Sequence, residues 1–169
     1  KYVGSEIRSM LLSKMQIHES KNLCVISGES IAVEAAMMNG EGTVIAVEYK
    51  ERDRETMEEN VNQFGLRNVT IVDHVGEDTM AELPVPDTTM LVASASLEQE
   101  LAYLTKVNPN MEFVIYTLDF KVAASMRDIL AKFGITDVTI IQIAVSKLTS
   151  KNVFENQPAP WIISAKAGV

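Results

Sequence analysis

The feature that most constrains this chain is a regular alternation between short apolar runs and stretches with helical spacing. The apolar runs, rich in β-branched residues, lie at 22–26, 43–47, 69–72, 89–93 and 111–117. Stretches whose apolar residues recur every three to four positions lie at 6–15, 32–38, 52–64, 77–83, 97–106 and 122–133. Strand–helix–strand alternation is typical of parallel strands joined by right-handed crossovers. The chain is therefore predicted to be an α/β protein with helices on both faces of a mostly parallel sheet.

The end of the chain breaks this rhythm. Two apolar runs at 138–145 and 161–165 follow each other without a helical stretch, and the polar connection 146–160 contains two prolines. Successive strands without a crossover helix pair antiparallel. The predicted sheet therefore has seven strands, which are five parallel strands and a C-terminal antiparallel hairpin. This layout matches the class I methyltransferase (Rossmann-like) fold. A nicotinamide-binding fold of this length would more often add a sixth parallel strand.

Composition argues against several classes of partner. The length suits one ordinary domain, so residues 1–169 are interpreted as a single unit. The 15 basic and 23 acidic residues give a formal net charge of −8, which argues against a nucleic-acid partner. No apolar run approaches the roughly 20 residues of a membrane span, so no membrane partner is predicted.

The cysteine and histidine content argues against a disulfide and a transition-metal site. Cys24 is the single cysteine, which fits a reducing cytoplasm, and its apolar neighbours favour a buried hydrophobic role. His18 and His74 have no Cys or His partner at ligand spacing, so no metal site is predicted.

Candidate binding residues come from the strand ends, because an open parallel sheet binds its ligand at the carboxyl ends of its strands. Glu48 ends the second run, about 20 residues after the first loop, where a carboxylate can accept hydrogen bonds from the ribose hydroxyls of a nucleoside cofactor. A solvated strand-end glutamate is the alternative. Tyr49 is interpreted as an adenine contact or as an ordinary edge aromatic, and Ala93 follows the fourth run.

The loop after the first run holds Ser27, Gly28 and Glu29 and so has one glycine. Cofactor loops use glycines because a Cβ blocks the close approach of the backbone to the ligand. A negative charge at Glu29 suits a sulfonium better than a pyrophosphate. The loop therefore favours S-adenosylmethionine over a nicotinamide dinucleotide.

Several short motifs occur in order along nearly the whole chain. They are Glu6-Ile7-Arg8, Ile31-Ala32-Val33-Glu34-Ala35-Ala36, Val44-Ile45-Ala46-Val47-Glu48, Glu59-Asn60, Phe64-Gly65-Leu66, Asn68-Val69, Val145-Ser146-Lys147 and Gln157-Pro158-Ala159-Pro160-Trp161-Ile162-Ile163-Ser164. Together they resemble the decarboxylating precorrin methyltransferases of cobalamin biosynthesis, either the T-type subunit or the C-terminal half of the E/T fusion.

That resemblance implies an activity. S-adenosylmethionine would donate a methyl group to a meso carbon (C15) of a corrin precursor of the precorrin-6Y/6B type, with loss of an acetate carboxyl and release of S-adenosylhomocysteine. It also implies a homotetramer, and a chain that begins at Lys1 is consistent with excision from a fusion whose E-type half methylates a second meso carbon. Because the substrate ring carries many carboxylates, we expect basic side chains to grip it. The candidates are Arg8, Lys121, Lys147 and Lys151.

Departures from the family pattern fall at the cofactor positions. The family's Asp-x-Gly-x-Gly-x-Gly loop aligns with residues 23–29, which lack the Asp and all three glycines, and its N-terminal Thr aligns with Val3. The Asp that faces the adenine aligns with Val75, and the glycine run after the fourth strand aligns with 92–96. The predicted cofactor-binding residues are Val3, Ser27, Gly28, Glu29, Glu48, Tyr49 and Ala93.

No general acid or base is assigned from the sequence. Two alternatives to a corrinoid methyltransferase stay open. One is a catalytically degenerate domain with a scaffold or corrinoid-binding role, because side chains fill the cofactor loop while the core pattern is kept. The other is an enzyme of the same fold that methylates a different acceptor.

Overall fold

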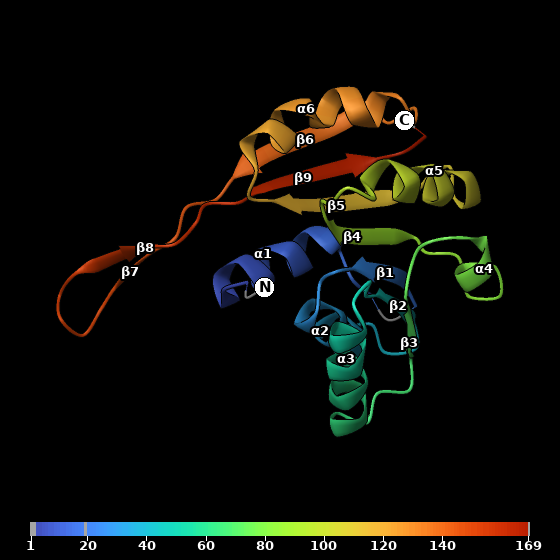
Figure 1. The fold of residues 1–169 in the computed structure, drawn as a ribbon, viewed down its shortest axis with the longest axis horizontal. Helices are drawn as coiled ribbons and strands as arrows, with labels where there is room; N and C mark the ends of the chain where they lie inside the picture. The colour runs from blue at the N-terminus through green and yellow to red at the C-terminus, as the bar shows by residue number, and fades with distance from the viewer. Residues whose placement is uncertain (1–2, 19, 169) are drawn as a thin grey trace.

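A seven-stranded sheet runs through the centre of the molecule, in the order β3-β2-β1-β4-β5-β9-β6 (Figure 1). This computed structural model describes residues 3–18 and 20–168, so Lys1, where the predicted excision lies, is outside the described residues. The strands are β1 (Asn22–Ile26), β2 (Thr43–Val47), β3 (Val69–Val72), β4 (Thr88–Val92), β5 (Glu112–Thr117), β6 (Asp137–Gln142), β7 (Ser146–Leu148), β8 (Phe154–Asn156) and β9 (Trp161–Lys166). The helices are α1 (Ser5–Met15), α2 (Ser30–Met38), α3 (Glu51–Gln63), α4 (Glu77–Met80), α5 (Leu97–Val107) and α6 (Phe120–Ala131).

The strand directions confirm the predicted mostly parallel sheet with a closing antiparallel pair. Strands β3, β2, β1, β4 and β5 are parallel neighbours. Strand β9 runs antiparallel between β5 and β6, with Ile163 opposite both Ile115 and Ile140. The last strand therefore inserts into the sheet, and β6 forms its outer edge.

Helices cover both faces of the sheet, which explains why its strands read as continuous apolar runs. Leu23 and Val25 of β1 belong to the core formed with α1, α2 and α3. Cys24 and Ile26, which point to the opposite face, belong to the core formed with α4, α5 and α6. None of the helices in the described ranges is long and apolar enough to cross a membrane.

Glycines set the ends of two helices. Gly65 and Gly134 follow α3 and α6 with φ of +61° and +75°, the left-handed conformation that ends a helix. Two details differ from the prediction. The helix expected at 77–83 is the single turn α4, because the prolines that follow prevent its extension. Phe64, expected on the buried face of α3, is half-exposed because it lies past the last turn.

The polar connection 146–160, for which the sequence predicts no strand, contains an antiparallel hairpin of β7 and β8, with Lys147 opposite Glu155. We call this hairpin the arm. It extends away from the body of the molecule (Figure 1). All residues of both strands are exposed, so no alternation of buried and exposed residues marks them in the sequence.

Candidate functional site

A cavity of about 650 Å³ opens at the carboxyl ends of β1, β2 and β4. Its lining residues are Ser27, Glu29, Ser30, Glu48, Tyr49, Lys50, Arg52, Asp53, Thr56, Met57, Asn60, Val92, Ala93 and Ser94. The fold thus brings together five of the seven predicted cofactor-binding residues. The position follows from topology, because the strand order reverses at β1, which pairs with β2 on one side and β4 on the other.

Glu48 provides a buried carboxylate at the end of β2. Its side chain is 2 % exposed, and Oε2 accepts a hydrogen bond from the backbone N–H of Glu29 at 3.3 Å. Burial raises the pKa of Glu48 to about 7, and the nearby charges of Asp53 and Glu29 act in the same direction. The carboxyl group is therefore close to half-ionised at neutral pH, and its ionised form is a strong acceptor for ligand hydroxyls.

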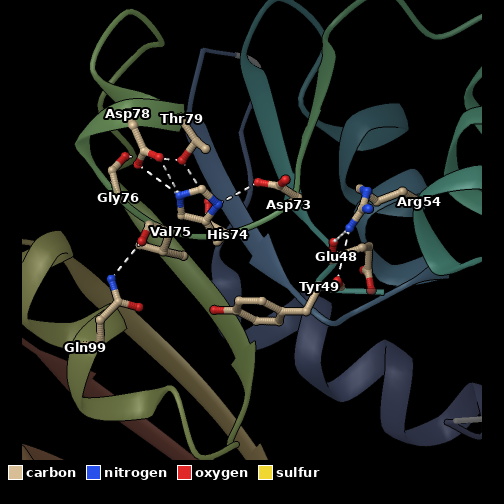
Figure 2. A network of polar contacts seen from close by, with 10 residues as sticks. All are labelled: Glu48, Tyr49, Arg54, Asp73, His74, Val75, Gly76, Asp78, Thr79 and Gln99. Carbon is tan, nitrogen blue, oxygen red and sulfur yellow. Dashed lines mark hydrogen bonds and ion pairs between the residues drawn. The ribbon is translucent and has the colours of Figure 1, made fainter. Parts of the chain in front are cut away.

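Arg54 fixes the backbone at this strand end. Its Nη1 donates to the carbonyl oxygens of Glu48 at 2.9 Å and of Tyr49 at 3.1 Å (Figure 2). Because Arg54 lies on α3, the guanidinium ties the end of β2 to the helix that follows it. Two elements therefore hold Glu48, because Arg54 of α3 holds its backbone carbonyl and the Glu29 N–H at the start of α2 holds its carboxylate.

Tyr49 reaches from the cavity wall into the core. In Figure 2 its ring points away from Arg54. The Tyr49 hydroxyl is hydrogen-bonded to the carboxylate of Glu100 on α5. Glu100 is fully buried, and burial raises the pKa of this carboxyl group. Burial and the Glu100 carboxylate also raise the pKa of the Tyr49 phenol. This anchor sets the orientation of the ring. Glu100 is not predictable from the sequence, because a glutamate within a helix is typical of a solvated face.

The loop after β1 is strained at two residues that line the cavity. Ser27 has φ of +57°, and Glu29 has φ of +49° with ψ of −116°. Side chains with a Cβ adopt these conformations at a cost of about 1–3 kcal/mol. These are two of the positions where the family pattern has glycine. The substituted loop therefore keeps a glycine-like backbone.

Two predicted residues lie outside the cavity lining. Gly28 is buried beneath the loop, where a Cβ would overlap Cγ1 of Val25, so this glycine permits packing against β1. Val3 packs against the core of the α1–α3 face, and its carbonyl oxygen accepts a hydrogen bond from Nη1 of Arg8 at 3.0 Å.

The expected basic residues also lie apart from the cavity lining. Arg8 forms an ion pair with Glu34 at 3.0 Å, and Lys147 of the arm forms one with Glu6 of α1 at 2.5 Å. Lys121 is exposed at the start of α6, and Lys151 is exposed at the turn of the arm.

One wall of the cavity comes from α3 and was missed. Asp53, Thr56 and Asn60 lie three and four positions apart, on one face of the helix, and all three line the cavity. Charged residues within a helix are typical of a solvated outer face, so the sequence alone does not point to this wall. Their three-to-four spacing next to a candidate strand end was the signal that could have identified them.

The turn after β3 is held by a histidine between two aspartates. Nδ1 of His74 lies 2.6 Å from Oδ1 of Asp73, and Nε2 lies 2.8 Å from Oδ2 of Asp78 (Figure 2). Hydrogen bonds to Asp78, which has the larger effect, and to Asp73 raise the pKa of His74. The next residue, Val75, is buried, and its carbonyl oxygen accepts a hydrogen bond from Nε2 of Gln99 at 2.7 Å. Within residues 3–18 and 20–168, no group of three or more His, Cys, Asp or Glu residues is arranged to hold a metal ion.

Comparison with known families decides the class of this site. A profile described as the precorrin methyltransferase domain matches residues 3–159. The chain belongs to the precorrin methyltransferase domain family. A search of curated proteins found no match to it.

Solved structures share the fold of this precorrin methyltransferase domain. A precorrin-6y C5,15-methyltransferase from Geobacter metallireducens superposes with a TM-score of 0.87 at 22% identity, over 97% of this chain and 89% of that one. The precorrin 8W decarboxylase of Methanobacterium thermoautotrophicum gives 0.80 at 16% identity, over 100% and 92%. The C-terminal domain of the Rhodobacter capsulatus precorrin-6Y C5,15-methyltransferase gives 0.74 at 17%, over 99% and 91%.

Family membership makes the chain a methyltransferase of corrin precursors in cobalamin biosynthesis, and S-adenosylmethionine is the cofactor expected from the sequence. The cavity fits that cofactor in three respects. Its volume is within the range of small-molecule sites, its lining includes the Glu48 carboxylate, and the carboxylates of Glu29 and Asp53 suit a cationic sulfonium.

Proposed function

We propose that this domain methylates the meso carbon C15 of a precorrin-6Y/6B-type ring and removes an acetate carboxyl group in the same catalytic cycle. The observation that carries the proposal is the buried Glu48 carboxylate at the carboxyl end of β2, in the cavity of a precorrin methyltransferase domain. No finding favours the alternative of a degenerate scaffold domain or of a different acceptor.

The cavity residues have separate roles in this proposal. Glu48 accepts hydrogen bonds from the ribose hydroxyls, and the backbone of Ser27 and Glu29 borders the cofactor. Tyr49, whose ring is fixed through Glu100, and Ala93 form the wall beside the adenosine. Gly28 allows the loop to pack closely against β1. Val3 has its proposed role as a cofactor contact from the N-terminal segment that Arg8 holds through the Val3 carbonyl oxygen.

When bound, S-adenosylmethionine supplies an electrophilic methyl group on a sulfonium. Held by Glu48 and by the loop of Ser27 and Glu29, the cofactor would give this methyl group to the meso carbon and would leave as S-adenosylhomocysteine, with the bonding pair kept on sulfur. The ring becomes an electron sink, so the acetate side chain loses CO₂ and its bonding pair neutralises the ring. The side-chain carbon that carried the carboxyl group then gains a proton, and the methylated meso carbon loses one. This sequence asks the protein mainly for positioning.

The proposal includes a homotetramer, and the arm supports it. Leu148, Val153 and Phe154 are between 56% and 65% exposed there, and exposed apolar clusters of this kind mark subunit contacts. Serine in place of all three residues should lower the sedimentation coefficient of the assembly. An unchanged coefficient would count against the role of the arm.

We also propose that the domain works in the cytoplasm beside an E-type methyltransferase domain, fused or separate. One structural relative is itself named as the C-terminal domain of a larger enzyme, which supports a partner of this kind. The buried free thiol of Cys24 suits a reducing compartment.

Calorimetric titration with S-adenosylhomocysteine tests the cofactor site. Wild-type protein should bind in the micromolar range, and Glu48→Ala should abolish measurable binding. Glu55→Ala is the matched control, because Glu55 is an exposed carboxylate of α3 outside the cavity lining. No binding by folded wild-type protein up to millimolar ligand would overturn the proposal.

A further inference from the structure

Large apolar side chains are exposed at the carboxyl edge of the sheet, beyond the cofactor cavity. Leu118 is 49% exposed and Phe120 is 66% exposed, at the turn between β5 and α6. The ring of Phe120 packs against the half-buried Trp161, with centroids 5.7 Å apart and planes tilted by 57°. We call these three residues the apolar ledge. Side chains of this size are usually buried, so their exposure at a ligand-binding edge indicates a contact surface.

The apolar ledge and the cofactor cavity lie on the same edge of the sheet. Ala93 of the cavity wall donates its N–H to the carbonyl oxygen of Tyr116 in β5 at 2.9 Å. In the next strand pair, Trp161 lies opposite Thr117, one residue before Leu118. Two strand spacings, about 10 Å in all, therefore separate Ala93 from Trp161. A large ring that reaches the cavity from this side must pass over the apolar ledge.

The chemistry of the apolar ledge suits a broad ring with apolar faces and a charged rim. Phe120 and Trp161 offer aromatic surface to a flat partner. Lys121 follows directly and is exposed, and its backbone N–H is held by the Asp119 carboxylate at 2.8 Å. A cation placed next to aromatic surface complements peripheral carboxylates around an apolar ring. A nucleic acid could use the same combination, but the formal net charge of −8 argues against that partner.

We propose that the apolar ledge seats the corrin-precursor ring, with one face of the macrocycle on Phe120 and Trp161 and its edge toward the cofactor cavity. This assignment rests on the proposed function for its ligand. It adds the binding surface for the acceptor, which is formed by the turn after β5 and the first residue of β9.

The single tryptophan of the chain reports directly on this surface. We would titrate the protein with hydrogenobyrinic acid, a metal-free corrin with peripheral carboxylates, and follow Trp161 fluorescence. Saturable quenching is expected, and Phe120→Ala should weaken the affinity at least tenfold, the change that about 1.4 kcal/mol produces. Phe64→Ala is the matched control, because Phe64 is 51% exposed at the far end of α3 and should leave the affinity unchanged.

Calorimetry with S-adenosylhomocysteine separates this inference from the proposed function. If both Phe120→Ala and wild type bind S-adenosylhomocysteine and bind the corrin equally well, the apolar ledge is not the seat of the ring and the methyltransferase site stands. Absence of corrin binding to wild type also overturns the inference. A third outcome, in which Phe120→Ala dissociates the oligomer without changing corrin affinity, would identify the apolar ledge as a subunit contact and overturn it as well.

Discussion

The two halves of the carboxyl edge of the sheet are built in opposite ways. At β1 and β2 the edge is polar and buried, with the Glu48 carboxylate held by the Glu29 N–H and a loop in left-handed backbone conformations. At β5 and β9 it is apolar and exposed, with Phe120 against Trp161, and none of residues 117–120 has a positive φ. A few fixed polar groups suit a small cofactor of defined shape, whereas open apolar area suits a large ring.

The largest expected effect is a separation of the two binding events. Glu48→Gln keeps the shape of the side chain but removes its charge, so hydrogen bonds to the ribose hydroxyls lose their charge assistance. S-adenosylhomocysteine affinity should fall about 100-fold, equivalent to about 2.7 kcal/mol. Corrin affinity should not change, and Phe120→Ala should show the reverse pattern. If each variant weakened both ligands equally in calorimetry, the edge would act as one site.

The pH dependence of cofactor binding sharpens the same comparison. Glu48 has a pKa of about 7 and must be ionised to act as a strong acceptor, so its ionised fraction falls as pH falls. S-adenosylhomocysteine affinity should drop about tenfold from pH 8 to pH 6. Glu48→Gln should remove this dependence, and His74→Gln serves as the control for the other titrating group near the edge. A wild-type profile that is flat over this range would contradict the assigned role.

The free energy of unfolding should also depend on the titration of Glu48, but it should fall as pH rises, whereas the cofactor affinity should increase. The pKa of Glu48 is raised from 4.5 to about 7 on folding, so the folded state binds the proton more tightly. The resulting stabilisation is fully present below pH 4.5 and is lost as pH rises through about 7. Glu48→Gln should therefore unfold at a higher urea concentration than wild type at pH 8, with the difference disappearing near pH 4.

The sequence allowed the strands and most helices to be predicted because burial on both faces leaves continuous apolar runs. It could not show the arm, since exposed residues such as Lys147 and Phe154 carry no burial pattern. In the site, Glu48 was predictable because its place after β2 is set by topology. It was not predictable that Gly28 faces β1 rather than the cavity, because a glycine that permits packing and a glycine that faces a ligand look alike in sequence. The buried Glu100 was hidden for a related reason, since its partner Tyr49 is 51 residues away.

Strain in the loop after β1 gives a smaller effect, expressed in stability. Glycine at position 29 relieves the left-handed backbone, so Glu29→Gly should raise the free energy of unfolding by about 1–2 kcal/mol. Glu29→Ala is the matched control, because it removes the carboxylate but keeps the Cβ. Urea unfolding of the two variants isolates the backbone contribution. Equal midpoints would mean that the strained conformation is not what separates this half of the edge from the other.

The smallest expected effect concerns two lysines predicted to grip the ring. Lys121 lies beside the apolar ledge, whereas Lys147 is paired with Glu6 on α1. Lys121→Met should therefore weaken corrin binding about threefold, the scale of an exposed charge pair. Lys147→Met should leave corrin affinity unchanged.

A second measurement tests whether Lys147 is paired with Glu6. Hydrogen bonds from Lys147, which has the larger effect, and from Ser5 lower the pKa of Glu6 to about 2. Lys147→Met should therefore move the pKa of Glu6 toward 4.5 in an NMR titration. If Lys147→Met instead weakened corrin binding and left the pKa of Glu6 unchanged, the arm would reach the substrate. The ring would then contact three regions of the molecule, and the contrast between the two halves of the edge would not be enough to describe how it is held.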